Sequence, residues 1–446
     1  MHRETFHRAA LAALVVVFLA LACAYSWITP VPPGDSHNPD EDAHVRYVQV
    51  VAAGRLPVLR GDRLASDGYE AHQPPLYYAL CAPVYRVALR FGPVAAVRAV
   101  RGVSMLLEAL TILAVFGGVR TLFPRDSRLA LGAAGFVALL PMHIALAASV
   151  TNDALADLWM AVGFWLVASL AAANPSGDAA GWTRGALRLG LVLGLGAWTK
   201  AVCLPLFLAA ALAFVLVARE RLAPASSALR AGALCLGVGA LLASGWLLRN
   251  QALYGDPLAQ RAFTQVLGAT HVNTPASSMA RFFGGPVPYA GAVAQWTQAS
   301  FWGGFDSMRL FWGQSPSQPH PDYQRAPGPV YGLLLLLCAG AVLGLLRSLR
   351  PGVLSAAQRI GLRCGGLLIL SAVLFLLQFN RLYFQAQGRF LFPALAPLAL
   401  GFVLGWRGWL PDDQRFGGFL GVLGAGLLLL NLYTLFGLLL PRFHAA

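Results

Sequence analysis

Apolar runs of about twenty residues recur along the chain, and polar stretches separate them. A run of this length is what an α-helix needs to cross the hydrocarbon core of a bilayer. The pattern predicts an all-α polytopic membrane protein, with residues 1–446 forming one transmembrane domain. We expect eleven spans, at about 9–29, 98–119, 129–147, 153–172, 187–199, 201–218, 228–248, 329–346, 358–377, 390–406 and 417–439.

Two of these assignments have alternatives. The first run, from Leu11 to Ile28, follows Arg3 and Arg8 and has the form of a cleaved signal peptide. No clean small-residue cleavage site follows it, so we interpret it as a retained transmembrane helix. The fifth and sixth segments, 187–218, also fit one kinked or broken hairpin.

The composition excludes several classes of protein. A mean hydropathy of +0.62 with 12% charged residues is not that of a soluble enzyme. The formal charge of +14 comes from arginines that are dispersed in short loops, so we expect no nucleic-acid partner. The six cysteines fall mostly in apolar segments and show neither metal-ligand spacing nor a disulfide framework.

The arginines predict the orientation in the membrane. With the N-terminus in the cytoplasm, every inner connection with room for a basic residue carries arginine, as the positive-inside rule requires. These residues are Arg120, Arg125, Arg128, Arg184, Arg188, Arg219, Arg221, Arg230, Arg347, Arg350, Arg359, Arg407 and Arg415. Two long polar stretches, 30–97 and 249–328, then lie outside, and we expect any chemistry at that face.

The first outer stretch contains an unusual group of acids. The sequence NPDEDAHVRY, 38–47, predicts a helix over about 39–53, with Asn38 as N-cap and Pro39 as the first helical residue. Asp40 and His44 then lie one turn apart. HQPPLYY, from residue 72, opens a second short helix that we expect to lie in the membrane plane or to be half buried. The acids also fit a simple helix cap, since they complement the helix dipole.

These residues carry a family resemblance. PDEDAHVRYVQVVAAGRLP followed by HQPPLYY resembles the first external loop of the GT-C superfamily of membrane glycosyltransferases. This superfamily includes protein O-mannosyltransferases, the lipid A aminoarabinose transferase and the catalytic subunit of oligosaccharyltransferase. The resemblance implies an inverting transfer of a sugar from a polyprenyl-phosphate donor. The acceptor would be a lipid, a glycan or a protein at the periplasmic face of a bacterial inner membrane, with 249–328 as a cap over donor or acceptor.

The resemblance places Asp40 at the catalytic position. A glycosyl phosphate carries a good leaving group, so the reaction needs a general base for the acceptor, and a carboxylate can supply it. Glu41 is the second candidate, as partner of Asp40 or as the base itself. His44 would orient Asp40 or contact the sugar. Asp42 leaves room for a divalent cation such as Mg²⁺ or Mn²⁺, with Asp40 and Asp153 as further candidate ligands.

Basic residues near the outer face are candidates for the donor phosphate. Lys200 is the single lysine of the chain and also fits a snorkelling anchor. Arg389 is the preferred phosphate clamp, because a guanidinium binds phosphate oxygens bidentately. Arg381 and Arg249 are further candidates.

Other outer residues are candidates for contacts with sugar or acceptor. They are His72, Asn152, Asp153 and Trp302. Asn152 and Asp153 also fit an ordinary helix start. Trp302 belongs to an aromatic group, with Phe305, Phe311 and Trp312, that suits either a sugar-stacking wall or an interfacial belt.

Within the second span, Glu108 and Arg101 are expected to form an ion pair away from the site. Two functions other than glycosyl transfer are also compatible with acidic residues and phosphate-binding arginines at the outer face. A transporter or flippase for lipid-linked sugars predicts polar residues along the spans and symmetry between halves, and the sequence shows neither. A non-catalytic protein that binds lipid-linked glycans is disfavoured by the retained Asp-Glu pair.

Overall fold

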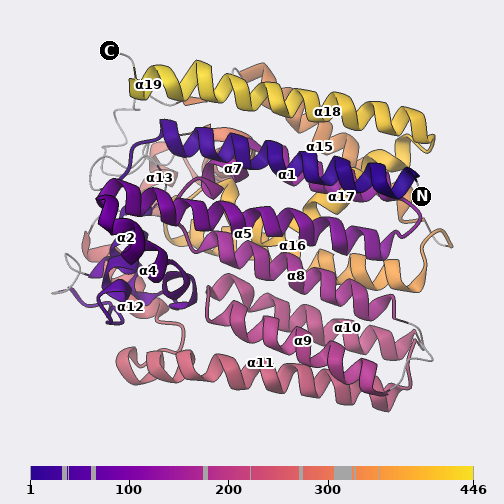
Figure 1. Ribbon diagram of the computed structural model, residues 1–446, viewed down its shortest axis with the longest axis horizontal. Helices are drawn as coiled ribbons and strands as arrows, with labels where there is room; N and C mark the ends of the chain where they lie inside the picture. The colour runs from indigo at the N-terminus through magenta and orange to yellow at the C-terminus, as the bar shows by residue number, and fades with distance from the viewer. Residues whose placement is uncertain are drawn as a thin grey trace.

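The structure is a computed structural model, and it describes residues 2–32, 38, 40–61, 67–173, 179–220, 222–270, 275–305, 324–325, 328–350 and 352–444. Long helices run side by side along its longest axis (Figure 1). They are α1 (His2–Ile28), α5 (Pro93–Leu122), α6 (Ser127–Leu139), α8 (Asp153–Ala171), α9 (Ala179–Ala197), α10 (Pro205–Arg219), α11 (Ala225–Tyr254), α15 (Gly328–Ser348), α16 (Ala356–Leu382), α17 (Leu395–Trp409) and α18 (Asp413–Tyr433). The short helix α7 (Pro141–Ala147) follows α6. A π-helical segment, Thr434–Leu439, joins α18 to α19 (Leu440–His444).

The chain is a multi-pass membrane protein. Among the described residues, nine helices are long and apolar enough to cross a bilayer, and α6 with α7, bent by 61°, makes a tenth candidate. All eleven predicted segments are helical, but the count of eleven spans is not confirmed. The difference is α9, where Arg184, Arg188 and five glycines dilute the apolar content.

Small residues let neighbouring helices approach closely. The pair α15 and α17 shows this most clearly, because a Cβ on Gly405 would lie 2.0 Å from the carbonyl oxygen of Ala341. A Cβ on Gly344 would lie equally close to the carbonyl oxygen of Gly405. Such contacts between backbones are typical of membrane helix pairs.

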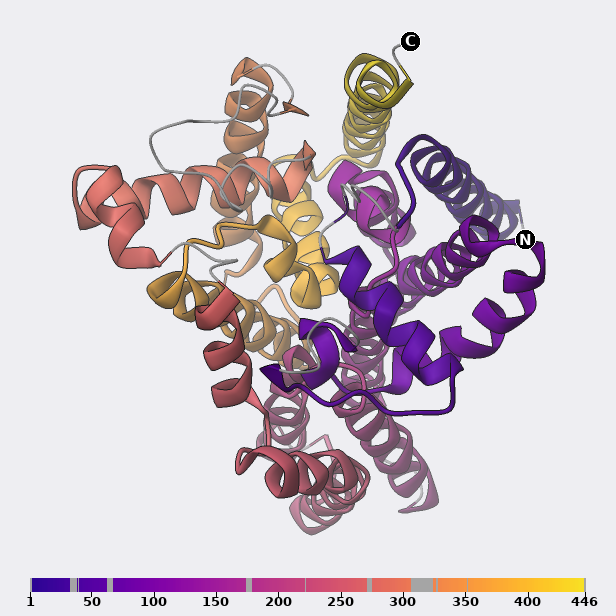
Figure 2. The same ribbon diagram turned by 90° about the vertical axis from the view of Figure 1, so that its left-hand side faces the viewer.

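Shorter elements cover one end of the bundle, which we call the capped end (Figures 1 and 2). They include α2 (Glu41–Ala52), α4 (Leu76–Ala88), α12 (Gln260–Thr270), α13 (Ala276–Phe282), α14 (Pro286–Gly303), and the 3₁₀ helices η2 (Tyr69–His72), η3 (Leu89–Phe91), η4 (Ala201–Cys203) and η6 (Gly388–Ala394). Two-residue strands, β1 (Gly304–Phe305) and β2 (Gln324–Arg325), pair antiparallel. The connections predicted to lie outside therefore gather at one end, and the start of α1 lies at the other.

Two local predictions were wrong. Helix α2 begins at Glu41, and its N-cap residue is Asp40 in the left-handed conformation (φ 60°), so Asn38 does not cap it. Arg101 does not pair with Glu108. Seven residues separate them on α5, about 10 Å along the axis, and Arg101 instead pairs with Glu41 while Glu108 pairs with His143.

Candidate active site

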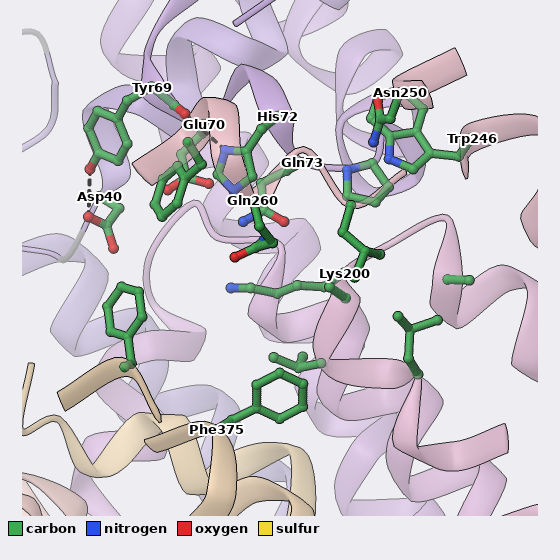
Figure 3. Close-up of a pocket in the computed structure, with 18 of the residues that line it drawn as sticks. Asp40, Tyr69, Glu70, His72, Gln73, Lys200, Trp246, Asn250, Gln260 and Phe375 are labelled. Atoms are coloured by element: carbon green, nitrogen blue, oxygen red, sulfur yellow. Dashed lines mark hydrogen bonds between the residues drawn. The ribbon is translucent and has the colours of Figure 1, made fainter. Parts of the chain in front are cut away.

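A cavity of about 310 Å³ opens between the cap and the bundle (Figure 3). Its wall combines residues from the first outer stretch with residues from α11, α12, α16 and η6. Asp40, His44, His72, Lys200 and Arg389, all predicted from the sequence as site residues, line this one cavity. The fold therefore brings together segments that are up to 349 residues apart.

Asp40 lies on the wall of the cavity with both carboxylate oxygens engaged. Its Oδ1 accepts a hydrogen bond from the Tyr69 hydroxyl at 2.5 Å, and its Oδ2 accepts one from Nη2 of Arg389 at 2.5 Å. Burial pushes the pKa of Asp40 up, but the charge and hydrogen bond of Arg389 and the hydrogen bond of Tyr69 outweigh it and leave the pKa below its ordinary value. Asp40 is thus held ionised, with 14% of its side chain exposed.

Asp40 and Arg389 belong to a chain of alternating charges. Nζ of Lys200 lies 2.5 Å from Oδ1 of Asp153, and Nη1 of Arg389 lies 3.7 Å from the other Asp153 oxygen. The order is Lys200, Asp153, Arg389, Asp40, so two cations are balanced by two carboxylates. The balance lets four charged groups coexist in a largely buried site.

Glu41, the second candidate base, points away from the cavity. It is fully buried and pairs with Nε and Nη2 of Arg101 at 2.8 and 2.7 Å, and it also accepts a hydrogen bond from the backbone N–H of Val150. Arg101 in turn donates to the backbone oxygens of Ser26, Thr29 and Pro30. Glu41 therefore ties the start of α2 to α1 and α5, and does not line the cavity.

A second wall of the cavity is formed by η2 and α2. Figure 3 shows Glu70, His72 and Gln73 on this wall, with Lys200 extending into the cavity opposite them. Burial lowers the pKa of His72 to about 4 and also lowers the pKa of His44, whose Nδ1 lies 2.8 Å from the Tyr78 hydroxyl. Both rings are therefore neutral at neutral pH.

Sequence reasoning missed Tyr69 and Glu70. They stand directly before the quoted HQPPLYY stretch, and Glu70 is one of only 19 acidic residues in the chain. The sequence did offer one signal for Glu70, which is an acid in a predicted outer loop and lies two residues before the candidate His72. The contact between Tyr69 and Asp40 had no local signal, because it depends on how residues 29 positions apart meet.

Several predicted site residues do not line the cavity. Trp302 is 1% exposed and packs on Phe136 and Phe402, so the sugar-stacking prediction is wrong for it. Asn152 is fully buried and donates to the carbonyl oxygen of Thr199. Phe311 and Trp312 lie outside the described residues.

Two of the predicted phosphate ligands also lie elsewhere. Arg381 is exposed at the end of α16, with a hydrogen bond to Gln378, so its guanidinium lies outside the cavity. Arg249 stacks on Trp246 and donates to the carbonyl oxygen of Pro57, which fixes the first outer stretch against α11.

The residues do not fit the predicted divalent cation. Asp40 and Asp153 both contact Arg389, whose positive charge occupies the place between them. Asp42 does not line the cavity. Within the described ranges, no three His, Cys, Asp or Glu side chains are grouped so that they could hold a metal.

A larger apolar cavity, of about 930 Å³, adjoins the polar one. It lies between α10, α11 and α16, and Leu204, Leu247, Pro257 and Phe375 line both cavities. The polar site thus adjoins an apolar space among helices that are long enough to span a membrane.

Comparisons with known proteins agree with this arrangement. Residues 72–244 match the family model of dolichyl-phosphate-mannose-protein mannosyltransferases. No curated protein matches this sequence. This family and the structural neighbours given below are glycosyltransferases.

Solved structures share the fold. The oligosaccharyltransferase of Archaeoglobus fulgidus in the apo form is similar, with a TM-score of 0.57 and 13% identity over 99% of this chain and 56% of that one. The same enzyme with an inhibitory peptide and a dolichol-phosphate is similar with a TM-score of 0.53 and 12% identity, over 99% of this chain and 56% of that one. ArnT from Cupriavidus metallidurans bound to undecaprenyl phosphate is similar with a TM-score of 0.50 and 15% identity, over 98% of this chain and 72% of that one.

The chain spans about half the length of the oligosaccharyltransferase that it matches. At these identities the likeness shows the fold, and the resemblance to the GT-C superfamily predicted from the sequence is confirmed. The protein is a multi-pass membrane protein with the GT-C fold.

Proposed function

We propose that this protein is an inverting glycosyltransferase that moves a sugar from a polyprenyl-phosphate donor to an acceptor at the periplasmic face of a bacterial inner membrane. The observation that carries the proposal is one cavity that holds a carboxylate, Asp40, and two cations, Arg389 and Lys200, beside an apolar space. The match of residues 72–244 to the family model of dolichyl-phosphate-mannose-protein mannosyltransferases supports the proposal. So do the lipid phosphates bound by ArnT and the archaeal enzyme.

The two cavities bind different parts of the donor. Its phosphate binds Arg389 and Lys200, because a guanidinium and an ammonium stabilise the charge that the leaving phosphate develops. Its polyprenyl chain lies in the apolar cavity between α10, α11 and α16, which shares wall residues with the phosphate site. The N-terminus then lies in the cytoplasm and the capped end in the periplasm.

The chemical step is a single displacement. The acceptor hydroxyl or amine attacks the anomeric carbon, the bond from that carbon to the phosphate oxygen breaks, and polyprenyl phosphate leaves. Asp40 takes the proton from the acceptor as general base. One displacement inverts the anomeric configuration. No step is assigned to a metal ion, because Arg389 stands where the acids would hold it.

The donor also prepares the base. Before it binds, both oxygens of Asp40 accept hydrogen bonds, from Tyr69 and from Arg389, and these bonds lower its basicity. A donor phosphate on Arg389 competes with Asp40 for the guanidinium and releases Oδ2 toward the acceptor. The site therefore favours binding of the donor before proton transfer.

Substitution of Lys200 by glutamine is expected to weaken donor binding by about tenfold or more, because a charge-assisted hydrogen bond to phosphate is lost. Binding of undecaprenyl phosphate to purified protein in lipid nanodiscs measures this. Arg381→Gln is the matched control, since Arg381 is basic, lies near the capped end and does not line the cavity. Equal loss in both variants would show that general charge, and not Lys200, attracts the lipid.

The pH dependence should differ between the two substrates. In the free protein Arg389 and Tyr69 hold the pKa of Asp40 below its ordinary value. Once a donor phosphate competes for Arg389, this pKa rises. The acid limb of kcat/KM for the donor reports the free enzyme. We expect it at lower pH than the acid limb of kcat/KM for the acceptor at saturating donor. Coincident limbs would contradict the release of Asp40 by donor.

A further inference from the structure

Glu70 is a buried acid of the cavity wall with one unsatisfied side-chain oxygen. The residue is 6% exposed, it lines the cavity, and its Oε2 has no hydrogen-bond partner within the described part of the chain. Burial raises the pKa of Glu70, although the nearby His44 opposes the shift. A buried polar atom without a partner is costly, and such atoms are few in native proteins. A ligand in the cavity can supply the missing partner.

The surroundings of Glu70 indicate the chemistry of that ligand. His44, His72, Gln73 and Gln260 line the cavity together with it, and all four present hydrogen-bonding groups that are neutral at neutral pH. Asp40, Arg389 and Lys200 provide the charges that the transfer step uses. The cavity thus has a charged part for phosphate and base, and a part suited to uncharged polar groups.

The charge of the cavity argues against a cationic ligand at Glu70. Burial and the negative charge of Asp40 raise the pKa of the Glu70 carboxyl and disfavour its anionic form, while Lys200, which Figure 3 shows extending into the cavity, places a cation nearby. An ammonium group bound to Glu70 would stand in the same small cavity as this lysine. A hydroxyl avoids that repulsion, and it can pair with a carboxyl group in either protonation state.

We propose that Glu70 binds a hydroxyl group of the transferred sugar, so that the site selects a neutral sugar over an amino sugar. The inference rests on the proposed function, because it assigns the uncharged part of the same cavity to the glycosyl group of the donor. Glu70 is then a residue for substrate recognition, distinct from the base and from the phosphate ligands.

The test compares lipids that differ only in the sugar. Binding of undecaprenyl phosphate, undecaprenyl-phosphate mannose, undecaprenyl-phosphate glucose and undecaprenyl-phosphate glucosamine is measured by calorimetry with the full chain in nanodiscs. The unaltered protein should bind at least one neutral sugar lipid more tightly than the bare lipid phosphate and than the glucosamine lipid. Glu70→Ala should lose about ten- to one-hundredfold in affinity for that neutral sugar lipid and keep its affinity for undecaprenyl phosphate.

Two further variants make the result specific. Glu70→Gln keeps an acceptor and a donor at the same place, so it should retain most of the affinity for the sugar. Glu220→Ala is the control, because Glu220 pairs with Arg359 and Arg363 and lies outside the cavity. It should leave every affinity unchanged.

The inference is overturned if Glu70→Ala weakens all the lipids equally, if it weakens none, or if no neutral sugar adds affinity to the unaltered protein. Preferred binding of the glucosamine lipid would also overturn it. If the unaltered protein fails to bind undecaprenyl phosphate, the proposed function itself fails, and the inference falls with it.

Discussion

Replacement of Asp40 by asparagine is expected to slow sugar transfer by about 10²–10⁴-fold, the usual contribution of a general base. Asparagine has nearly the same shape, and its amide oxygen can still accept a hydrogen bond from Arg389 while its amide nitrogen faces the Tyr69 hydroxyl oxygen. It cannot take the acceptor proton. Donor binding should persist, because Arg389 and Lys200 remain and Arg389 loses a competing carboxylate.

The matched control is Asp42→Asn. Asp42 is two residues away, carries the same charge and does not line the cavity. Transfer of label from a polyprenyl-phosphate sugar should be near normal for this variant. If Asp40→Asn and Asp42→Asn transferred equally well, Asp40 would be no more than a helix N-cap, and the assignment of the base would be wrong.

Loss of Arg101 is expected to destabilise the protein by about 3–5 kcal/mol, the usual effect of leaving a buried charge without its partner. Arg101 and Glu41 are both fully buried, so removal of Arg101 leaves the Glu41 carboxylate in the interior without its partner. Thermal unfolding of Arg101→Met in detergent should show a markedly lower Tm than the unaltered protein. Arg363→Met is the control, because Arg363 is half exposed and its ion pair with Glu220 is long.

The same experiment separates two functions for Glu41. As a positioning residue, Glu41 should affect stability and activity together, so Glu41→Gln should lower the Tm. A Glu41→Gln protein with an unchanged Tm but no transfer would instead identify Glu41 as the base.

The sequence predicted most of the fold because the membrane imposes a simple rule on it. A helix that crosses a bilayer must be apolar over about twenty residues, and this requirement can be read locally. Helix α9 does not meet this requirement, because its arginines and glycines lower its mean hydropathy. It packs against α11.

Three residues of the cavity could be singled out from the sequence because each is unusual for its position or type. Asp40 stood in a rare acidic stretch, Lys200 was the single lysine, and Arg389 stood on the outer side where the positive-inside rule does not favour arginine. The structure brings these three together. The candidate metal ligands Asp40 and Asp153 both contact Arg389, and no sequence pattern shows that this arginine comes between them.

Partners set by the fold could not be predicted. Arg101 was assigned to Glu108 on its own helix, but the fold offers it Glu41 from α2. Trp302 and Arg381 had the residue types of site residues, and only their burial or exposure shows that they lie elsewhere. Tyr69 and Glu70 belong to the 3₁₀ helix η2 and line the cavity.

The central claim is that the cavity transfers a sugar from a lipid phosphate. The most direct measurement incubates the purified protein with polyprenyl-phosphate sugars and a membrane extract, and follows both lipid and sugar by mass spectrometry. We expect free polyprenyl phosphate to appear together with an equal amount of a new glycoconjugate, and both to appear at least about 10²-fold more slowly with Asp40→Asn. If the sugar lipid were bound or moved across the bilayer with its sugar still attached, the protein would be a carrier or a binding protein, and the claim would be wrong.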